Sequence, residues 1–407
     1  MFALPAADTW KGGRLMERRS FLKGAAIVTV AVVSGGVWRA YDQGVFSVGK
    51  GPAYEPWKNW RNANESPLAL VRAAILAASP HNTQPWLFKV TNSSIALHID
   101  PSRNVGALDP YLREEHIGMG CALENLMLAA RANGYTATTT LVPGKLDLIP
   151  AQPKPQLLAR VDLTPGAREE SELYDAIPRR HTNRGPYDPR KSIPPDFLDA
   201  LTHLPGEDAE TKLFLFEEEA VRKKIVEVSS AANSEIYSDP DVRRSSERWV
   251  RLKWTEVQKY RDGLTIDAFG LPTIADATAK MMTPGMLAWA GSHSAKNGYT
   301  NLMLSAPLIG FIAVRDRYDQ ESCLRAGRLW QRAHLLATAR GLVGRPCNES
   351  VEMVDHERAL GKPASCLAKL NEITGDSTWQ PTFVFYMGYP TVTALASPRR
   401  GVDAVVV

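Results

Sequence analysis

The pattern of apolar and polar positions predicts a mixed succession of helices and strands after residue 66. Leu68, Val71, Ile75 and Leu76 fall on one face of a helix that begins after Pro67. Beyond this helix, short apolar runs bounded by turn residues predict strands at 86–90, 95–99, 158–163, 308–314 and 383–386. The chain therefore reads as an α+β protein.

Two helical segments in this pattern resemble each other. Residues 120–135 read GCALENLMLAARANGY and residues 327–342 read GRLWQRAHLLATARGL. Glycine, leucine, alanine, alanine and glycine recur at the same offset: Gly120, Leu128, Ala130, Ala132 and Gly134 match Gly327, Leu335, Ala337, Ala339 and Gly341. Each segment is closed by a glycine, which terminates a helix at little cost, and each has a predicted strand before and after it. This order favours duplication and predicts two tandem lobes.

The lobes set the expected domain boundaries. We expect an N-terminal signal at 1–41, an extended arm at 42–66, a first lobe at 67–170 and a second lobe at 171–407. Residues 230–300 are helical and tryptophan-bearing, and nothing in the first lobe corresponds to them. They predict an insertion that covers a site.

The N-terminus resembles a twin-arginine export signal. Arg18 and Arg19 precede Phe-Leu-Lys and an apolar run, 24–38, which is shorter than the ~20 residues that a spanning helix needs. The alternative is a buried N-terminal helix with two chance arginines. No small-x-small cleavage site follows, so residues 24–38 would remain as a membrane tether. We expect a periplasmic protein, or one tethered to the outer face of the cytoplasmic membrane, with the twin-arginine export machinery as a partner.

Composition narrows the function classes. Hydrophobic residues make up 44% and charged residues 23% of 407 residues, and the net charge is +4. No block of lysine and arginine is interleaved with aromatics, which argues against a nucleic-acid partner. The cysteines are neither two residues apart nor near a histidine cluster; they are Cys121, Cys323, Cys347 and Cys366. We expect buried free thiols rather than a metal site or a redox pair, although the even count leaves disulfides open.

Residues 79–86, SPHNTQPW, are the first segment with candidate chemistry. The segment stands at the end of a predicted helix and contains two prolines. Its candidate polar side chains are Ser79, His81, Asn82 and Gln84. A rigid loop with convergent polar groups suits a planar ligand that has several hydrogen-bonding edges. An ordinary proline turn would explain the serine and the asparagine, but it would not explain His81 and Gln84.

Residues 179–184, RRHTNR, are the second such segment. Arg179, Arg180, Thr182 and Arg184 form an array of donors, which is the chemistry that a dianionic phosphate requires. Taken alone, this run after Pro178 is more typical of a solvated basic loop.

Together the two segments resemble the flavin-binding motifs of the nitroreductase superfamily, and the chain is most similar to its two-lobed Acg family. There an RRSxR-like segment binds the FMN phosphate and a PSxxNxQPW-like segment lines the ring and ribityl chain. In this chain Thr182 replaces the usual serine, and Ser79 and Pro80 stand in inverted order. The resemblance implies one FMN as cofactor.

The same resemblance implies further cofactor contacts. Cys347 and Asn348 fall where the family presents backbone to the flavin N5 edge, and Arg399 or Arg400 would add a phosphate contact. The first lobe carries the ring motif and the second lobe the phosphate motif. We therefore expect a fused dimer that kept one site.

The function that the resemblance implies is reduction of an electron-poor acceptor, a nitroaromatic or a quinone, by NAD(P)H or another donor. The flavin carries the chemistry, so no side chain is expected to act as nucleophile. GxSxG, HExxH and Walker motifs are absent from the sequence. Two alternatives stay open: an FMN-storing or sequestering protein without turnover, and a membrane-tethered scaffold without cofactor. We expect a monomer or a weak oligomer, and no metal.

Overall fold

The structure is a computed structural model, and it describes residues 36–61, 67–206, 208–271, 273–282 and 300–407. The arginine pair at 18–19 and most of the apolar run 24–38 lie outside these residues, so the export signal stays a prediction. Within the described residues, no helix is both long and apolar enough to cross a membrane.

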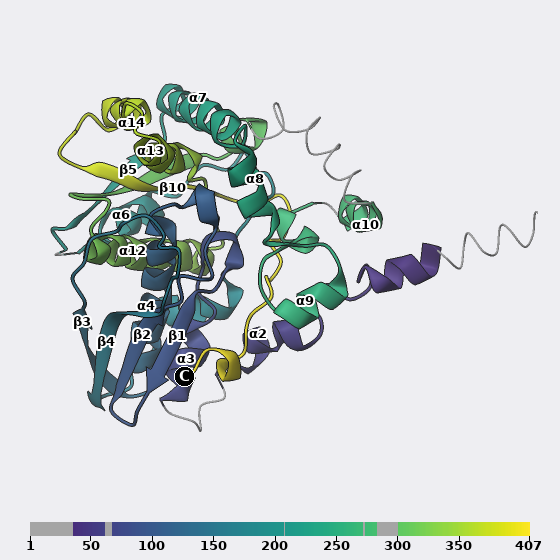
Figure 1. Cartoon of the computed structure of the whole chain (residues 1–407), viewed down its shortest axis with the longest axis vertical. Coiled ribbons are helices and arrows are strands. Elements are labelled where there is room, and N and C mark those ends of the chain that lie inside the picture. The colour runs from purple at the N-terminus through teal and green to yellow at the C-terminus, as the bar shows by residue number, and fades with distance from the viewer. Residues whose placement is uncertain (1–35, 62–66, 207, 272, 283–299) are drawn as a thin grey trace, which may run out of the picture.

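Two four-stranded sheets organise the chain (Figure 1). In spatial order, the first contains β1 (Trp86–Val90), β2 (Ser94–Ile99), β4 (Gln156–Pro165) and β3 (Tyr135–Leu141). The second contains β5 (Thr211–Phe216), β8 (Leu308–Val314), β10 (Gln380–Gly388) and β9 (Val343–Pro346). All neighbours are antiparallel. In both sheets the order is first, second, fourth, third strand, which confirms the α+β prediction.

The second strand of each sheet leads to a long helix. These helices are α4 (Arg113–Ala132) and α12 (Gln320–Ala339), and they pack against each other in the middle of the molecule. They contain the two repeat segments. Gly134 and Gly341 follow them with φ of 81° and 75°, the left-handed conformation that glycine adopts most easily. The repeat seen in the sequence is thus a repeat of strand order and of helix position.

Shorter helices surround this centre. Along the chain, α3 (Leu68–Ala74) precedes the first sheet and α5 (Glu172–Ala176) follows it, and α6 (Pro195–Thr202) precedes β5. Two more, α13 (Glu349–Ala359) and α14 (Ser365–Thr374), connect β9 to β10. Single 3-10 turns occur at Pro80–Asn82, Gly106–Leu108, Ile177–Arg179 and Val402–Ala404.

The connection between β5 and β8 is where the lobes differ most. It runs through residues 217–307, whereas β1 and β2 are joined by residues 91–93 alone. Its described elements are α7 (Glu219–Ile236), α8 (Pro240–Glu247), β6 (Val250–Arg251), α9 (Trp254–Tyr260), β7 (Leu264–Thr265), a 3-10 turn at Ile266–Phe269 and α10 (Thr273–Met281). The predicted insertion at 230–300 falls within this connection.

The segment before the first lobe differs from its prediction. Residues 52–59 are not extended but form a 3-10 turn (Pro52–Tyr54) and α2 (Glu55–Asn59). Trp57 and Trp60 are buried, and the indole of Trp57 donates to the carbonyl of Ser397 at 2.8 Å. The prolines that read as loop signals begin the turn and the helix, where a missing N–H costs nothing.

The C-terminal tail returns from the second lobe to the first. The N–H of Phe88 in β1 donates to Val405 at 2.8 Å, and the N–H of Val407 donates back to Phe88 at 3.0 Å. The tail therefore pairs with the open edge of the first sheet. This path brings Arg399 and Arg400 beside residues 79–86.

All four cysteines are buried free thiols, as expected from the sequence. Burial raises the pKa of each thiol: Cys121, Cys323, Cys347 and Cys366.

Candidate functional site

A cavity of about 470 Å³ lies where the two lobes, the β5–β8 connection and the C-terminal tail meet. This volume is within the range of small-molecule and cofactor sites. Both motifs found in the sequence line it: Ser79, His81 and Asn82 from the first, and Arg180, Thr182 and Arg184 from the second. Segments about a hundred residues apart thus share one cavity.

Arg180 is the most deeply buried cation of this cavity, with 2% of its surface exposed. One terminal nitrogen donates to the carbonyl of Leu76 at 3.0 Å, and its Nε and Nη1 are buried without a partner. Arg399, which is 3% exposed, donates to Asn82 Oδ1 at 2.6 Å and to Ala77 at 3.0 Å, and its Nε also lacks a partner. Buried donors without acceptors are costly, so these atoms point to a missing ligand.

The charges of these arginines are uncompensated. Within the described part of the chain, Arg180, Arg184 and Arg399 form no ion pair with a carboxylate. Burial lowers the pKa of Arg180 to about 10, and burial followed by the charge of Arg345 lowers the pKa of Arg184 to about 10. The pKa of Arg399 is also lowered, first by burial and then by Arg180. Repulsion among desolvated cations is relieved when an anion binds between them.

The loop that carries the first motif has an unusual backbone. His81, Asn82 and Gln84 have φ of 45°, 58° and 52°, a region that residues other than glycine seldom occupy. Ser79 Oγ accepts a hydrogen bond from the Gln84 N–H at 3.1 Å and closes the loop. The strain is held by contacts with three other parts of the chain.

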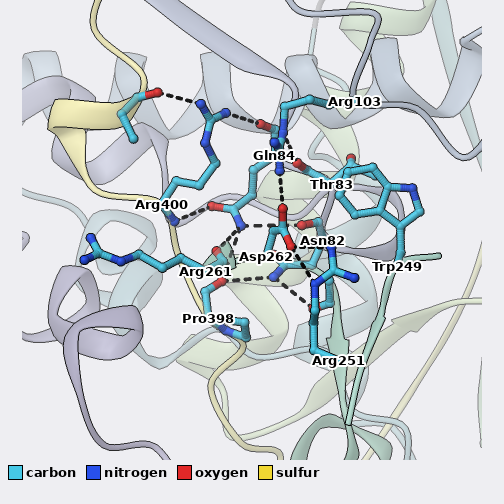
Figure 2. A network of polar contacts seen from close by, with 12 residues as sticks. Asn82, Thr83, Gln84, Arg103, Trp249, Arg251, Arg261, Asp262, Pro398 and Arg400 are labelled. Carbon is cyan, nitrogen blue, oxygen red and sulfur yellow. Dashed lines mark hydrogen bonds and ion pairs between the residues drawn. The ribbon is translucent and has the colours of Figure 1, made fainter. Parts of the chain in front are cut away.

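Figure 2 shows how the loop is held. The side-chain amide of Asn82 donates to the backbone carbonyls of Pro398 at 2.9 Å and of Gly263 at 3.2 Å. Gln84 Nε2 donates to the backbone carbonyl of Arg261 at 2.8 Å, and Gln84 Oε1 accepts from the backbone N–H of Arg400 at 2.8 Å. The loop is thereby tied to both the C-terminal tail and the β5–β8 connection.

Asp262 completes this anchor from the β5–β8 connection. Its carboxylate accepts from Arg103 at 2.5 Å and from Arg251 at 2.7 and 3.0 Å. Arg103 also donates to the carbonyl of Thr83 at 2.7 Å. Because Asp262 is only 4% exposed, these pairs are weakly screened by solvent.

His81 lines the cavity as a neutral side chain. Burial first and the charge of Arg184 second lower its pKa to about 4. Its Nε2 lies 2.7 Å from the hydroxyl of Ser246. It can therefore exchange a hydrogen bond in the cavity without adding charge.

Four residues predicted from the sequence do not face the cavity. Gln84 is fully buried and its amide is bound to backbone. Arg179 is exposed, because neighbouring residues of a turn point to different sides. The N–H of Cys347 donates to Val384 within the second sheet, and the guanidinium of Arg400 donates to the carbonyl of Gln84. Asn348 does line the cavity, although its Oδ1 accepts from the Val384 N–H at 2.9 Å.

Several lining residues were missed by the sequence motifs. Aromatic side chains contribute from the arm, from α7 and from the second lobe: Trp57, Tyr237, Trp330 and Phe383. Charged side chains were also missed: Glu114, Arg345, Glu349 and Glu352. None of them belongs to a local motif. Their spacing along the chain gives no signal, because they come from elements far apart in the sequence that only the tertiary fold brings together.

No protein-family model matches the chain. A Mycobacterium tuberculosis protein named "Putative NAD(P)H nitroreductase acg" is 34% identical over 130 residues, which are 31% of this chain and 36% of that protein. A second protein of that organism, also named as an NAD(P)H nitroreductase, is 32% identical over 125 residues, or 30% of this chain and 34% of its own. The chain thus spans about a third of the length of the curated relatives it matches.

Solved structures of nitroreductases align with a larger part of the chain at lower identity. An FMN-dependent nitroreductase, NfnB, from Mycobacterium smegmatis is 17% identical, covering 57% of this chain and 96% of its own, with a TM-score of 0.33. NfnB from Sphigopyxis sp. strain HMH is 14% identical, covering 58% and 97%, with a TM-score of 0.38. These TM-scores are too low to support an argument from structure. In sequence, the chain is similar to nitroreductases over about a third of its length.

Proposed function

We propose that the chain binds one FMN in this cavity and is an FMN-dependent oxidoreductase of the nitroreductase type. The observation that carries the proposal is the cluster of Arg180 and Arg184 from residues 179–184 with Arg399 from the C-terminal tail, which brings buried positive charge without an ion-pair partner among the described residues to one cavity. A phosphate dianion has the charge and the acceptor oxygens that this cluster lacks.

The remaining lining residues fit the rest of the cofactor. His81 and Asn348 offer polar groups near the arginines, and Trp330 and Phe383 offer apolar surface for a planar ring. Gln84 and Asn82 contribute by holding the loop and Arg399 in place. Bound FMN would supply transfer of a hydride or of single electrons to a nitroaromatic or a quinone, with NAD(P)H or another donor.

Two lobes with the same strand order support the view that the chain is a fused dimer with one retained site. We also propose that the protein is exported by the twin-arginine route. That part rests on the sequence around Arg18 and Arg19 alone.

Flavin content tests the proposal first, and turnover tests it second. The purified protein is denatured and the released flavin is identified and counted by chromatography. We expect FMN at one per chain; FAD, two FMN per chain or no flavin contradicts the proposal. NADPH and NADH are then added without oxygen, followed by a quinone, and we expect the flavin absorbance to bleach and return.

A second candidate is an FMN-holding protein without turnover. The contacts that favour it are those of Asp262, which hold the β5–β8 connection to Arg103 beside the cavity loop. The same experiment separates the two. Flavin that is first reduced by light and is then inert to quinone supports storage, whereas rapid reoxidation supports the enzyme.

A further inference from the structure

Three glutamates also line the cavity, and the binding of the FMN phosphate does not use them. Glu114 lies in the first turn of α4, and Glu349 and Glu352 lie in the first turn of α13. All three line the cavity. Two helices from different lobes therefore present carboxyl groups to the same space.

The carboxyl group of Glu352 is buried and has no partner. Its side chain belongs to a residue that is 7% exposed, and no hydrogen bond or ion pair from a described residue reaches its carboxyl oxygens. Burial raises its pKa well above the usual range, and the neighbouring Glu114 and Glu349 raise it further. A carboxyl group held protonated in this way loses its proton when a cation enters the cavity beside it.

Glu114 is only weakly compensated. Arg113 lies 3.3 Å from its Oε1, but the same guanidinium is 2.6 Å from Asp355. Arg113 therefore shares its charge between two carboxyl groups. Burial, opposed by Arg113 and reinforced by Asp109 and Asp355, raises the pKa of Glu114 to about 8.

Charge balance in the cavity points the same way. Four arginines and three glutamates line it. A bound phosphate dianion would neutralise part of the arginine charge, and a cation beside the glutamates would favour their ionised form. The rings of Tyr237 and Phe383 also line the cavity, and aromatic faces favour organic cations.

We propose that Glu114 and Glu352 bind the ammonium group of a cationic substrate, so that the acceptor reduced here carries a protonated amine beside its reducible ring. The inference rests on the proposed function for turnover, but not for binding of the amine.

A matched series of acceptors tests it: 4-nitrobenzylammonium, 4-nitrobenzyl alcohol and 4-nitrobenzoate. One charge-assisted hydrogen bond changes affinity by about tenfold to a hundredfold, so kcat/KM should favour the ammonium over the alcohol by about tenfold or more, with the benzoate lowest. In Glu352→Gln, which keeps the shape of the side chain, this preference should fall about tenfold. The control is Glu372→Gln, whose carboxylate is exposed and pairs with Lys224, and which should keep the preference.

Calorimetry with benzylammonium and benzyl alcohol gives the same ratio without turnover. A protein that reduces all three acceptors with similar kcat/KM retains the proposed function and overturns this inference. So does a preference that Glu352→Gln leaves intact. If the protein holds no FMN, the proposed function fails. The ratio of the affinities for benzylammonium and benzyl alcohol then decides alone whether Glu114 and Glu352 bind ammonium.

Discussion

Gly120 and Gly327 face each other where α4 crosses α12, at matching positions of the two repeat segments. A Cβ on Gly120 would lie 2.2 Å from the carbonyl oxygen of Leu324, and one on Gly327 would lie 2.0 Å from that of Ile117. Ile117 and Leu324 are themselves matching positions. The two contacts are therefore reciprocal, which is the signature of an interface with two-fold symmetry. This supports the origin of the chain as a fused dimer.

Alanine at either glycine should destabilise the protein. Each added methyl group meets backbone, which cannot rotate away, so we expect each change to cost about 1–3 kcal/mol. Thermal unfolding of Gly120→Ala and Gly327→Ala measures this. Gly36→Ala is the control, because a Cβ there meets nothing within 4 Å. Strong destabilisation by one variant and none by the other would argue against a symmetric contact.

Arg180→Met should abolish retention of FMN. It removes a buried cation that we assign to the phosphate, a loss of ~2–5 kcal/mol in binding. Because it also removes an uncompensated charge, the flavin-free variant should be no less stable than flavin-free wild type. The neighbouring Arg179→Met is the matched control, since Arg179 is exposed and does not line the cavity. Equal flavin loss in both variants would refute the assignment.

Asp262→Asn should loosen the β5–β8 connection from the cavity loop. It weakens the pairs with Arg103 and Arg251, which are largely buried, so we expect a loss of several kcal/mol in local stability. Hydrogen exchange at residues 249–265 should rise, and quinone should reoxidise the flavin faster. Asp241→Asn breaks an exposed pair with Arg244 and should do neither. Unchanged exchange in Asp262→Asn would mean that other contacts hold the connection.

Lysine at both Arg18 and Arg19 should leave the protein in the cytoplasm. The twin-arginine route distinguishes guanidinium from ammonium at this pair. Cell fractionation gives the result, with Arg14→Lys as a control outside the pair. Export of the double variant would show that another route is used.

The sequence predicted the parts of the fold that depend on local periodicity. The strands at 86–90 and 308–314 coincide with β1 and β8, and the repeat segments lie in or at the ends of α4 and α12. The folding of residues 52–59 was missed because proline and tryptophan are as common in loops as in short packed helices. Their role depends on the tail at Ser397, which lies more than 300 residues away.

The site was predictable to the level of segments, but not of single side chains. The two motifs do meet in one cavity, yet Gln84 and Arg179 turn away from it. The left-handed backbone at His81, Asn82 and Gln84 decides where the Gln84 side chain points, and residue type alone does not encode it. Glu114 and Glu352 had no local signal, because they come from helices of different lobes.

A crystal structure of the protein as purified tests the central claim most directly. The account predicts one FMN in the cavity, with its phosphate within hydrogen-bonding distance of Arg180, Arg184 and Arg399 and its ring beside residues 79–82. A flavin bound elsewhere, or a phosphate that contacts none of these arginines, would contradict it.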